Sequence, residues 1–313
     1  MADAKEKLAR AITAKFTQIM NNPREIEKVV RQAASTIERQ KISKRFFEDT
    51  YKKLYTPTEL DTRPFLNIGP GSFRHVHWRT SDKKYDGEAW TKMRRGIEQP
   101  EVDYDWDLYS RKGMPEADNF FKVIYLSHVI EHLFPEDVDH MLSEIRRLLE
   151  PHGLVRIVCP DAHLMATAYT NEDWMFFFHY LSVKTQRYDF PIPDQDLRER
   201  CARFLLDWVS LAVNEGNPQQ VPKGQASAFI EKHSDIYSAL DAAAAMSSRE
   251  VNMKIGAHVS WYTPQKLMSL LTKAGFTQVT VSRHLQSQEP ILRDPVYFDR
   301  TDPEMSMFVE ARR

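Results

Sequence analysis

Short apolar runs in the middle of the chain alternate with stretches of helical periodicity. Three runs, at residues 65–68, 121–126 and 154–159, have the length and composition of buried strands. Between the last two runs, apolar residues recur every three or four positions from 138 to 149, which predicts a helix. The turn at 151–153 predicts where that helix ends. A strand, a helix and a strand in this order form a parallel crossover unit, so we expect an open α/β sheet.

Helical patterns flank this region and divide the chain into four parts. Residues 1–60 are expected to form a helical N-terminal cap, and residues 61–161 the first half of the sheet domain. Residues 162–255 are too long for a loop and predict a helical insertion that acts as a lid. Residues 256–313 contain one more helix and two strands, which complete the sheet.

Composition narrows the classes of function. The 313 residues include 42% hydrophobic and 28% charged residues, enough for a sizeable core. The formal net charge of -1 provides no field that would concentrate nucleic acid, so no nucleic-acid partner is expected. Two cysteines, Cys159 and Cys201, are too few for a disulfide framework, which favours a cytoplasmic location. No leader peptide and no membrane span are predicted.

The first strand runs into a glycine turn, Leu-Asn-Ile-Gly-Pro-Gly-Ser, at residues 66–72. Gly69 and Gly71 allow a tight turn and a close approach to a ligand, and we expect a brief helix after them to offer free amide hydrogens. Asp82 follows at the tip of the next apolar segment, where α/β nucleotide folds accept hydrogen bonds from ribose hydroxyls. Asp107 and Leu108 come where the loop after a third strand could meet a base.

The fourth strand leads into Ser-His-Val-Ile-Glu-His at residues 127–132. His128 is our candidate for a general base, because an unperturbed imidazole has a pKa of about 6.5. The alternative is a histidine that only packs beside a ligand. Glu131 and His132 are predicted either to cap the helix that follows or to orient His128. Ser127 is placed with the ligand-binding residues.

With these elements in order, the chain resembles the class I S-adenosylmethionine-dependent methyltransferases, particularly a small-molecule and glycan-associated group. The resemblance covers residues 64–161 well and 258–313 more loosely, and it does not extend to the first sixty residues or the insertion. It implies a Rossmann-like sheet with helices on both faces, with S-adenosylmethionine as cofactor and S-adenosylhomocysteine as product. Gly69 and Gly71 would support the methionine part of the cofactor.

The same resemblance assigns the other cofactor contacts residue by residue. Asp82 would bind the ribose, and Asp107 with Leu108 would flank the adenine. Asn67 stands where many members have an acid, so its contact with the cofactor's amino group would be a hydrogen bond without charge.

The spacing His-x-x-Glu-His at residues 128–132 also occurs in inverted zinc peptidases. Those enzymes place both histidines on one helix, whereas this motif begins at a strand end, so hydrolysis is not favoured. We therefore assign no metal ligand. A divalent ion that assists an O-methyl transfer is the less favoured alternative.

Four later residues are candidates for the acceptor side of the site. Asp161 and His163 follow the fifth strand, whose end borders the binding crevice of such a sheet. His258 and Trp261 follow the insertion and precede the last helix. The alternative for each is a purely structural role in packing.

The predicted reaction is transfer of a methyl group to O or N of a small-molecule or sugar acceptor. One alternative is a non-catalytic binding or scaffold protein that keeps the fold. The other is a methyltransferase that acts on a macromolecule, for which a basic groove is expected. The N-terminal helices could cover the sheet or pair with a second subunit in a homo-oligomer, and both arrangements stay open.

Overall fold

The computed structural model describes residues 41, 45–84, 101–185 and 197–313. The chain divides into two compact units, residues 1–56 and residues 57–313. In the first unit, residues 45–54 form a helix. Most of the predicted N-terminal helical cap lies outside the described residues. The remainder of the description concerns the second unit.

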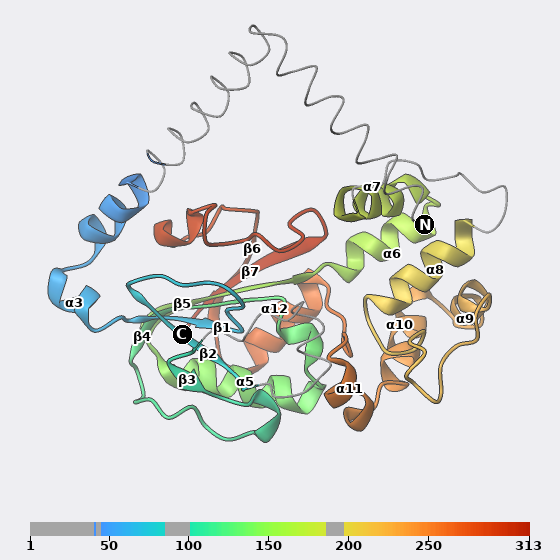
Figure 1. Ribbon diagram of the computed structural model, residues 1–313, viewed down its shortest axis with the longest axis horizontal. Helices are drawn as coiled ribbons and strands as arrows, with labels where there is room; N and C mark the ends of the chain where they lie inside the picture. The colour runs from blue at the N-terminus through green and yellow to red at the C-terminus, as the bar shows by residue number, and fades with distance from the viewer. Residues whose placement is uncertain (1–40, 42–44, 85–100, 186–196) are drawn as a thin grey trace, which may run out of the picture. The chain divides into compact units, whose positions relative to one another are not determined.

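A mixed sheet forms the centre of the second unit (Figure 1). Among the described residues its strands are β1 (Phe65–Ile68), β2 (Trp78–Asp82), β3 (Tyr104–Asp105), β4 (Phe121–Ser127), β5 (Leu149–Pro160), β6 (Thr277–Ser282) and β7 (Ser306–Arg312). Their order in the sheet is β3-β2-β1-β4-β5-β7-β6. The first five strands pair in parallel, and β7 runs antiparallel between β5 and β6. The predicted Rossmann-like α/β fold is confirmed.

Helices and 3-10 turns connect these strands. Those around the sheet are α3 (Pro57–Asp61), η1 (Leu108–Ser110), η2 (Ile130–His132), α5 (Pro135–Leu148), α12 (Pro264–Lys273) and η3 (Pro290–Arg293). Between β5 and α12 the chain forms α6 (Ala162–Thr170), α7 (Trp174–Thr185), α8 (Leu197–Asp207), α9 (Ala226–Glu231), α10 (Ile236–Ala245) and α11 (Arg249–Ile255). These six elements lie in the stretch for which the sequence predicts a helical insertion, and Figure 1 shows them together at one end of the sheet. We call them the insertion.

One face of the sheet packs against α5 and α12. Apolar residues of α5 repeat at helical spacing, including Leu142 and Ile145, and they are fully buried. They meet Leu66, Ile124 and Val155, which are neighbours across β1, β4 and β5. This face is an uninterrupted apolar core.

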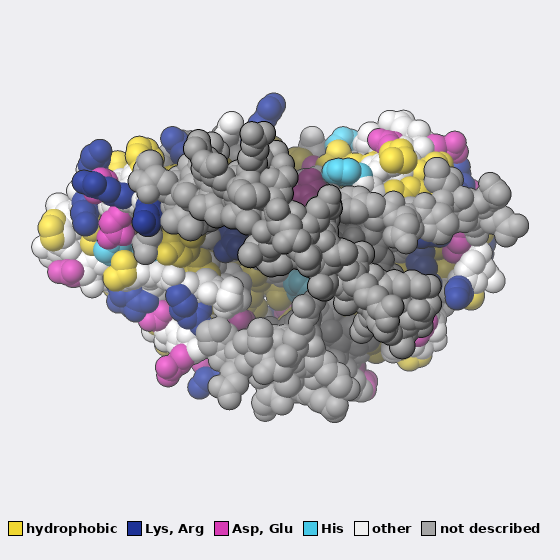
Figure 2. Space-filling view, turned by 45° about the horizontal axis from the view of Figure 1, so that its top comes forward, with side chains coloured by type: hydrophobic (Ala, Val, Ile, Leu, Met, Phe, Trp, Pro, Cys, Tyr) yellow, Lys and Arg dark blue, Asp and Glu magenta, His cyan; other side chains and the backbone are white. Residues whose placement is uncertain are grey.

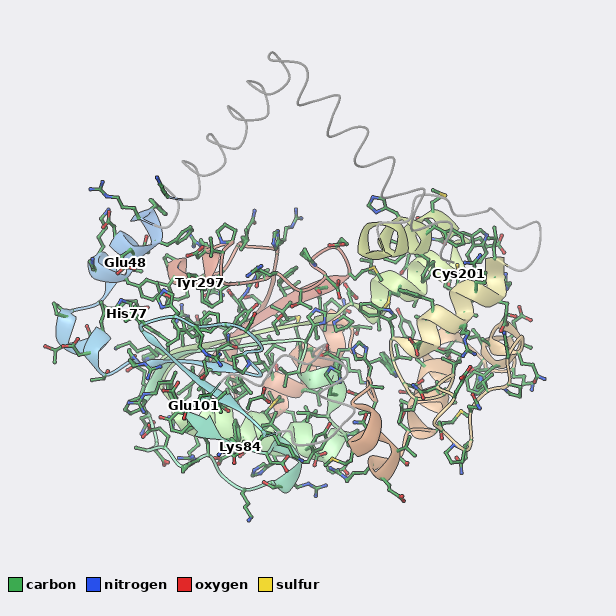
Figure 3. The ribbon with its side chains drawn as sticks, in the orientation of Figure 1. Glu48, His77, Lys84, Glu101, Cys201 and Tyr297 are labelled. Atoms are coloured by element: carbon green, nitrogen blue, oxygen red, sulfur yellow. The ribbon has the colours of Figure 1, made fainter. Side chains whose placement is uncertain are left out.

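The opposite face is covered by the segment that joins β6 to β7. Phe298 of this segment packs against Trp78 and Tyr125, with ring centroids 5.0 Å apart in both cases. Figure 3 labels the adjacent Tyr297, whose ring meets His75 at 4.9 Å. Aromatic side chains from distant parts of the chain thus anchor the β6–β7 segment to the sheet.

The insertion has an apolar core of its own. Buried residues of α6, α8 and α10 form it, including Met165, Leu205 and Leu240. Cys201, labelled on α8 in Figure 3, is buried in this core and is a free thiol, as is Cys159 in β5. The insertion is therefore a packed structure and not an extended loop.

Two local predictions were wrong. No helix follows the glycine turn, because residues 69–77 must bring the chain back along β1 so that Trp78 can pair in parallel with Phe65. An extended residue advances about 3.3 Å and a helical one about 1.5 Å, so a short connection of this kind cannot be helical throughout. In addition, α5 ends at Leu148, and β5 already begins at Leu149, before the turn at 151–153.

Candidate functional site

A cavity of about 310 Å³ opens at the carboxyl ends of β1, β2 and β4. It is lined by Ile68, Gly69, Gly71, Ser81, Asp82, Lys83, Trp106, Asp107, Leu108, Tyr109, His128, Val129, His132, Leu133 and Gly256. Open α/β sheets bind their ligands at this edge. We call it the first cavity.

Glycine is required at position 69 of the turn that borders this cavity. Its φ of 64° is a left-handed conformation, and a Cβ atom there would lie 2.5 Å from Val129 Cγ2. The backbone is fixed in place because the Gly69 amide donates to the Ser81 carbonyl at 2.8 Å. Gly71 is also left-handed, with a φ of 52°, but no atom lies within 4 Å of a Cβ built there. The turn thus leaves open space beside Gly71, where a ligand can approach the backbone.

The two predicted acids of the first cavity have different surroundings. Asp82 ends β2, and its Oδ1 accepts a hydrogen bond from the Lys83 amide at 2.8 Å. Asp107 precedes η1 and accepts from the Tyr109 amide at 3.0 Å, while its Oδ2 lies 3.1 Å from Lys83 Nζ. The Asp107 carboxylate therefore caps a 3-10 turn, and Leu108 beside it contributes the apolar wall.

A second cavity, of about 580 Å³, shares Gly69 and Gly71 with the first. Its lining residues are Asn67, Gly69, Pro70, Gly71, Ser72, Phe73, Arg74, Tyr125, Ser127, Val296, Tyr297, Arg300 and Thr301. Asn67 and Ser127, which were predicted beside the glycine turn, lie here. The sequence analysis did not identify Arg74, Tyr297 or Arg300 as site residues. Nothing in the local sequence links the β6–β7 segment to the glycine turn, which lies more than two hundred residues earlier.

His128 stands at the end of β4 between two polar partners. Its backbone is left-handed, with a φ of 56°, which is uncommon for a residue other than glycine and is often found at functional sites. Its Nδ1 lies 3.1 Å from Glu131 Oε1, and its Nε2 lies 2.9 Å from Ser306 Oγ. Both ring nitrogens are therefore positioned, one by the adjoining turn and one by β7.

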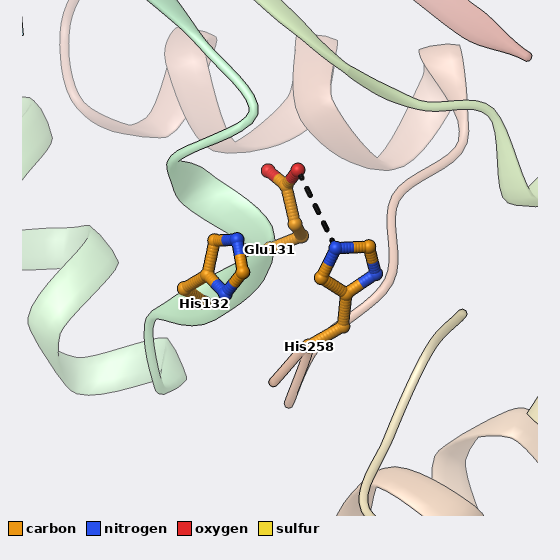
Figure 4. Close-up of side chains that lie close together, drawn as sticks. All are labelled: Glu131, His132 and His258. Atoms are coloured by element: carbon orange, nitrogen blue, oxygen red, sulfur yellow. Dashed lines mark ion pairs between the residues drawn. The ribbon is translucent and has the colours of Figure 1, made fainter. Parts of the chain in front are cut away.

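Glu131 is a buried carboxylate surrounded by histidines (Figure 4). Burial alone would raise its pKa, but the hydrogen bond and charge of His128, together with His132 and His258, outweigh burial and lower the pKa to about 2. His258 Nε2 lies 3.9 Å from Glu131 Oε1. Burial and the neighbouring His132 lower the pKa of His258 to about 4, so His258 is neutral near pH 7.

The suggestion that Glu131 and His132 cap the next helix was wrong. Both residues lie in η2, and α5 begins only at Pro135, after an N-cap at Phe134 that makes no side-chain cap bond. The side chain of Glu131 points away to the histidines instead. The other suggestion, that Glu131 orients His128, agrees with their 3.1 Å contact.

All four candidate acceptor residues lie outside the lining of both cavities. Asp161 caps α6 by accepting from the amides of His163 and Leu164. His163 is exposed, and its Nδ1 contacts Tyr237 Oη at 2.6 Å. Trp261 is 8% exposed and packs in the core of the insertion. The fourth, His258, adjoins Glu131 and is close to the first cavity through His132.

Residues 88–157 match the model of a family described as a methyltransferase domain. The match begins after the glycine turn and Asp82. It spans β3, β4, α5 and most of β5.

The chain is also similar to solved structures of S-adenosylmethionine-dependent methyltransferases. One is from Mesorhizobium loti (14% identity, 80% of this chain and 90% of that chain, TM-score 0.35). Another is from Archaeoglobus fulgidus (14% identity, 88% and 94%, TM-score 0.36). A third is human N-acetylserotonin methyltransferase in complex with S-adenosylmethionine (11% identity, 82% and 50%, TM-score 0.33).

The matched segment, residues 88–157, is similar to a methyltransferase domain, and it lies in a sheet of Rossmann-like α/β order. Among the described residues, no helix is both long and apolar enough to cross a membrane.

Proposed function

We propose that the protein transfers a methyl group from S-adenosylmethionine to an oxygen or nitrogen of a small-molecule or sugar acceptor. The observation that carries this proposal is that His128, held by Glu131 and Ser306, lines the same cavity as Asp82. A ribose-binding acid and a positioned base at one cavity are what methyl transfer to a protic acceptor requires.

The residues of the first cavity fit the cofactor. The open space beside Gly71 lets the cofactor approach the backbone. The carboxylate of Asp82 suits a ribose, and the apolar side chain of Leu108 suits an adenine ring. The methionine end would extend toward the second cavity, where Asn67 and Ser127 offer hydrogen bonds. Arg300, on the same cavity, would attract the carboxylate.

When bound, S-adenosylmethionine supplies an electrophilic methyl group. The protein's part is to align the acceptor and to remove its proton. His128 Nδ1 faces the Glu131 carboxylate and so carries a proton, which leaves Nε2 to receive the proton of the acceptor. The anionic Glu131 then stabilises the imidazolium that results. Ser306 Oγ, 2.9 Å from Nε2, holds the ring until the acceptor takes its place at that nitrogen.

The net charge of the chain favours a small acceptor over a nucleic acid. Figure 2 shows basic and acidic side chains among one another on the described part of the face it presents, with no large basic patch there. The net charge of the whole chain is -1. A nucleic-acid substrate would also make binding fall steeply with salt, which gives a direct way to separate the two classes.

Calorimetry of cofactor binding tests the proposal first. We expect Asp82→Ala to weaken S-adenosylmethionine and S-adenosylhomocysteine binding by about 1 to 3 kcal/mol, because hydrogen bonds to a charged group are lost. Asp105→Ala is the matched control, since Asp105 is exposed at the end of β3 and does not line the first cavity. No binding to the folded wild type would contradict the proposal.

Turnover is then measured as S-adenosylhomocysteine formed with a panel of hydroxyl and amine acceptors. His128→Asn should reduce the rate by about 100-fold or more, the usual contribution of a general base, while cofactor affinity stays near the wild-type value. Cofactor binding without turnover on any acceptor would favour the non-catalytic scaffold alternative.

A further inference from the structure

Three side chains that can ligate a metal converge beside the first cavity (Figure 4). Glu131 and His132 come from η2, and His258 comes from the segment between α11 and α12. Their ligand atoms all lie within 4.8 Å of one another. The two segments are joined by the backbone, because the amides of Val259 and Ser260 donate to the Glu131 carbonyl at 2.9 and 3.2 Å. We call these three residues the Glu131 cluster.

Hydrogen bonds to carbonyl groups fix the tautomer of both histidines. His132 Nδ1 lies 3.0 Å from the Ala257 carbonyl, and His258 Nδ1 lies 2.9 Å from the Trp208 carbonyl. A carbonyl oxygen can only accept, so each Nδ1 carries the proton and donates. In the neutral imidazole the other nitrogen, Nε2, is then a lone-pair donor that is free to ligate a cation.

The carboxylate of Glu131 brings a third lone-pair donor to the same place. Its side chain is 1% exposed, and Oε2 has no hydrogen-bond partner among the described residues. Oε1 lies 3.1 Å from His128 Nδ1 and 3.9 Å from His258 Nε2. A buried carboxylate oxygen without a donor is unfavourable, and a cation bound between it and the imidazole lone pairs would remove that cost.

We propose that the Glu131 cluster binds a divalent transition-metal ion, with Zn²⁺ as the ion that fits best. Two imidazoles and one carboxylate form a known zinc ligand set, and histidine ligands typically donate their other N–H to a carbonyl group. Ligands about 2.1 Å from a tetrahedral ion are about 3.4 Å apart. The 3.9 Å between His258 Nε2 and Glu131 Oε1, like the other separations within the 4.8 Å limit, would shorten toward this value when the ion binds.

This site departs from the sequence-based assignment, which named no metal ligand. The motif at residues 128–132 suggests both histidines of that motif as ligands, as in a peptidase. In the structure His128 instead contacts Glu131 and Ser306, and the second imidazole of the cluster is His258, from the far side of the insertion. Only the fold brings His258 to Glu131.

The role of the ion rests on the proposed function. Zinc sites with three protein ligands keep a fourth position for water or substrate, and His132 lines the first cavity. The ion would polarise an acceptor hydroxyl at that position, which would then lose its proton more easily to His128. The Glu131 cluster thus selects acceptors with an oxygen that can ligate the metal.

Metal binding is tested directly on the full chain without an affinity tag, after removal of metals with a chelator. Co²⁺ is titrated and followed by its visible absorption, and Zn²⁺ is then added as a competitor. We expect one Co²⁺ per chain with the intense bands of a tetrahedral site, and complete displacement by Zn²⁺. His258→Asn should weaken Co²⁺ binding by more than about 100-fold. Loss of a group that only hydrogen-bonds to a metal ligand costs about 10- to 100-fold in affinity, and loss of the ligand itself should cost more.

His284→Asn is the matched control, because His284 is exposed and lies outside the Glu131 cluster. This variant should bind Co²⁺ as tightly as the wild type does. Zinc-edge X-ray absorption of the wild type counts imidazole ligands without any substitution, and two are expected. A wild type without tetrahedral bands, a zinc spectrum without imidazole, or unchanged binding by folded His258→Asn would each overturn the site.

Calorimetry with S-adenosylmethionine on the same preparations separates the two proposals. Metal binding without cofactor binding supports the site and rejects the proposed function. Cofactor binding without metal binding rejects the site and leaves the proposed function in place.

Discussion

The two faces of the central sheet are built from alternate residues of the same strands, yet they are stabilised in different ways. On the α5 side, Leu66, Ile124 and Val155 form an apolar row across β1, β4 and β5. On the opposite side, the next residues in register are Asn67, Tyr125 and Arg156. One face is a conventional apolar core, and the other carries a polar row.

The polar row depends on residues from the β6–β7 segment and from β7. Arg156 is fully buried, and its guanidinium donates to Asp299 at 2.6 Å and to Glu310 at 2.7 Å. The Asp299 amide donates to the Tyr125 hydroxyl at 2.8 Å. Burial and the nearby Asp299 raise the pKa of Tyr125 above its usual range, so this hydroxyl stays protonated.

The difference shows why the second cavity forms where it does. Apolar side chains can pack against any apolar neighbour, whereas the polar row needs hydrogen-bonding partners at fixed distances. The β6–β7 segment supplies such partners. The same segment also contributes Tyr297 and Arg300 to the lining of the second cavity. Asn67 and Tyr125 belong both to the polar row and to the cavity lining. The buried ion network therefore positions one wall of the candidate site.

The largest effect is expected from breaking the ion network. Asp299→Ala leaves the Arg156 charge buried without its main partner, so the free energy of unfolding should fall by about 4 kcal/mol. Urea denaturation measures it. Glu231→Gln, which removes an exposed ion pair with Arg198, should cost less than about 1 kcal/mol. Equal effects of the two substitutions would show that the polar face does not depend on the network.

A cavity in the apolar face should have a slightly smaller effect. Leu142 is fully buried on α5, and Leu142→Ala should lower the free energy of unfolding by about 3 kcal/mol through lost burial and the space left behind. Cofactor affinity should change little, because Leu142 lines neither cavity. If this variant lost cofactor binding while it remained folded, the two faces would not be independent.

The smallest effect is expected from pH at the edge of the polar face. Burial, with a contribution from His77, lowers the pKa of His75 from 6.5 to about 4. The unfolded chain therefore takes up this proton at a higher pH than the folded chain, so stability falls as the pH drops from 6.5 to 4. After allowance for solvent screening, the free energy of unfolding should be about 1 kcal/mol lower at pH 5 than at pH 7.

This pH effect is measured as the difference in urea midpoint between pH 7 and pH 5. His75→Gln should show a smaller difference than the wild type, whereas His284→Gln should behave like the wild type because His284 is exposed. The same pH dependence in wild type and His75→Gln would exclude His75 as its source.

Much of the lining of the first cavity was predictable because its parts lie at strand ends that the apolar pattern marks. Gly69, Gly71, Asp82, Leu108 and His128 follow directly on strands or on short loops, and parallel strands bring their carboxyl ends to one edge. The prediction of capping by Glu131 was wrong because the sequence does not show that three further residues precede α5 or that histidines surround the carboxylate.

Residues from far along the chain were not predictable as site residues. Ser306 contacts His128 from β7, and Arg300 reaches the second cavity from the β6–β7 segment. His258 was chosen as an acceptor contact, but its position beside Glu131 depends on how the insertion returns to the sheet. No local periodicity encodes such long-range contacts.

The sequence by itself determined the strands, the crossover helix and the glycine turn, because periodicity and the conformational freedom of glycine act over a few neighbouring residues. The tertiary structure decided which charges share the buried face and which histidines meet at Glu131. These contacts form because buried polar groups need hydrogen-bonding or ionic partners, and here the partners lie more than a hundred residues away in the sequence. Their relative positions are fixed only when the chain has folded.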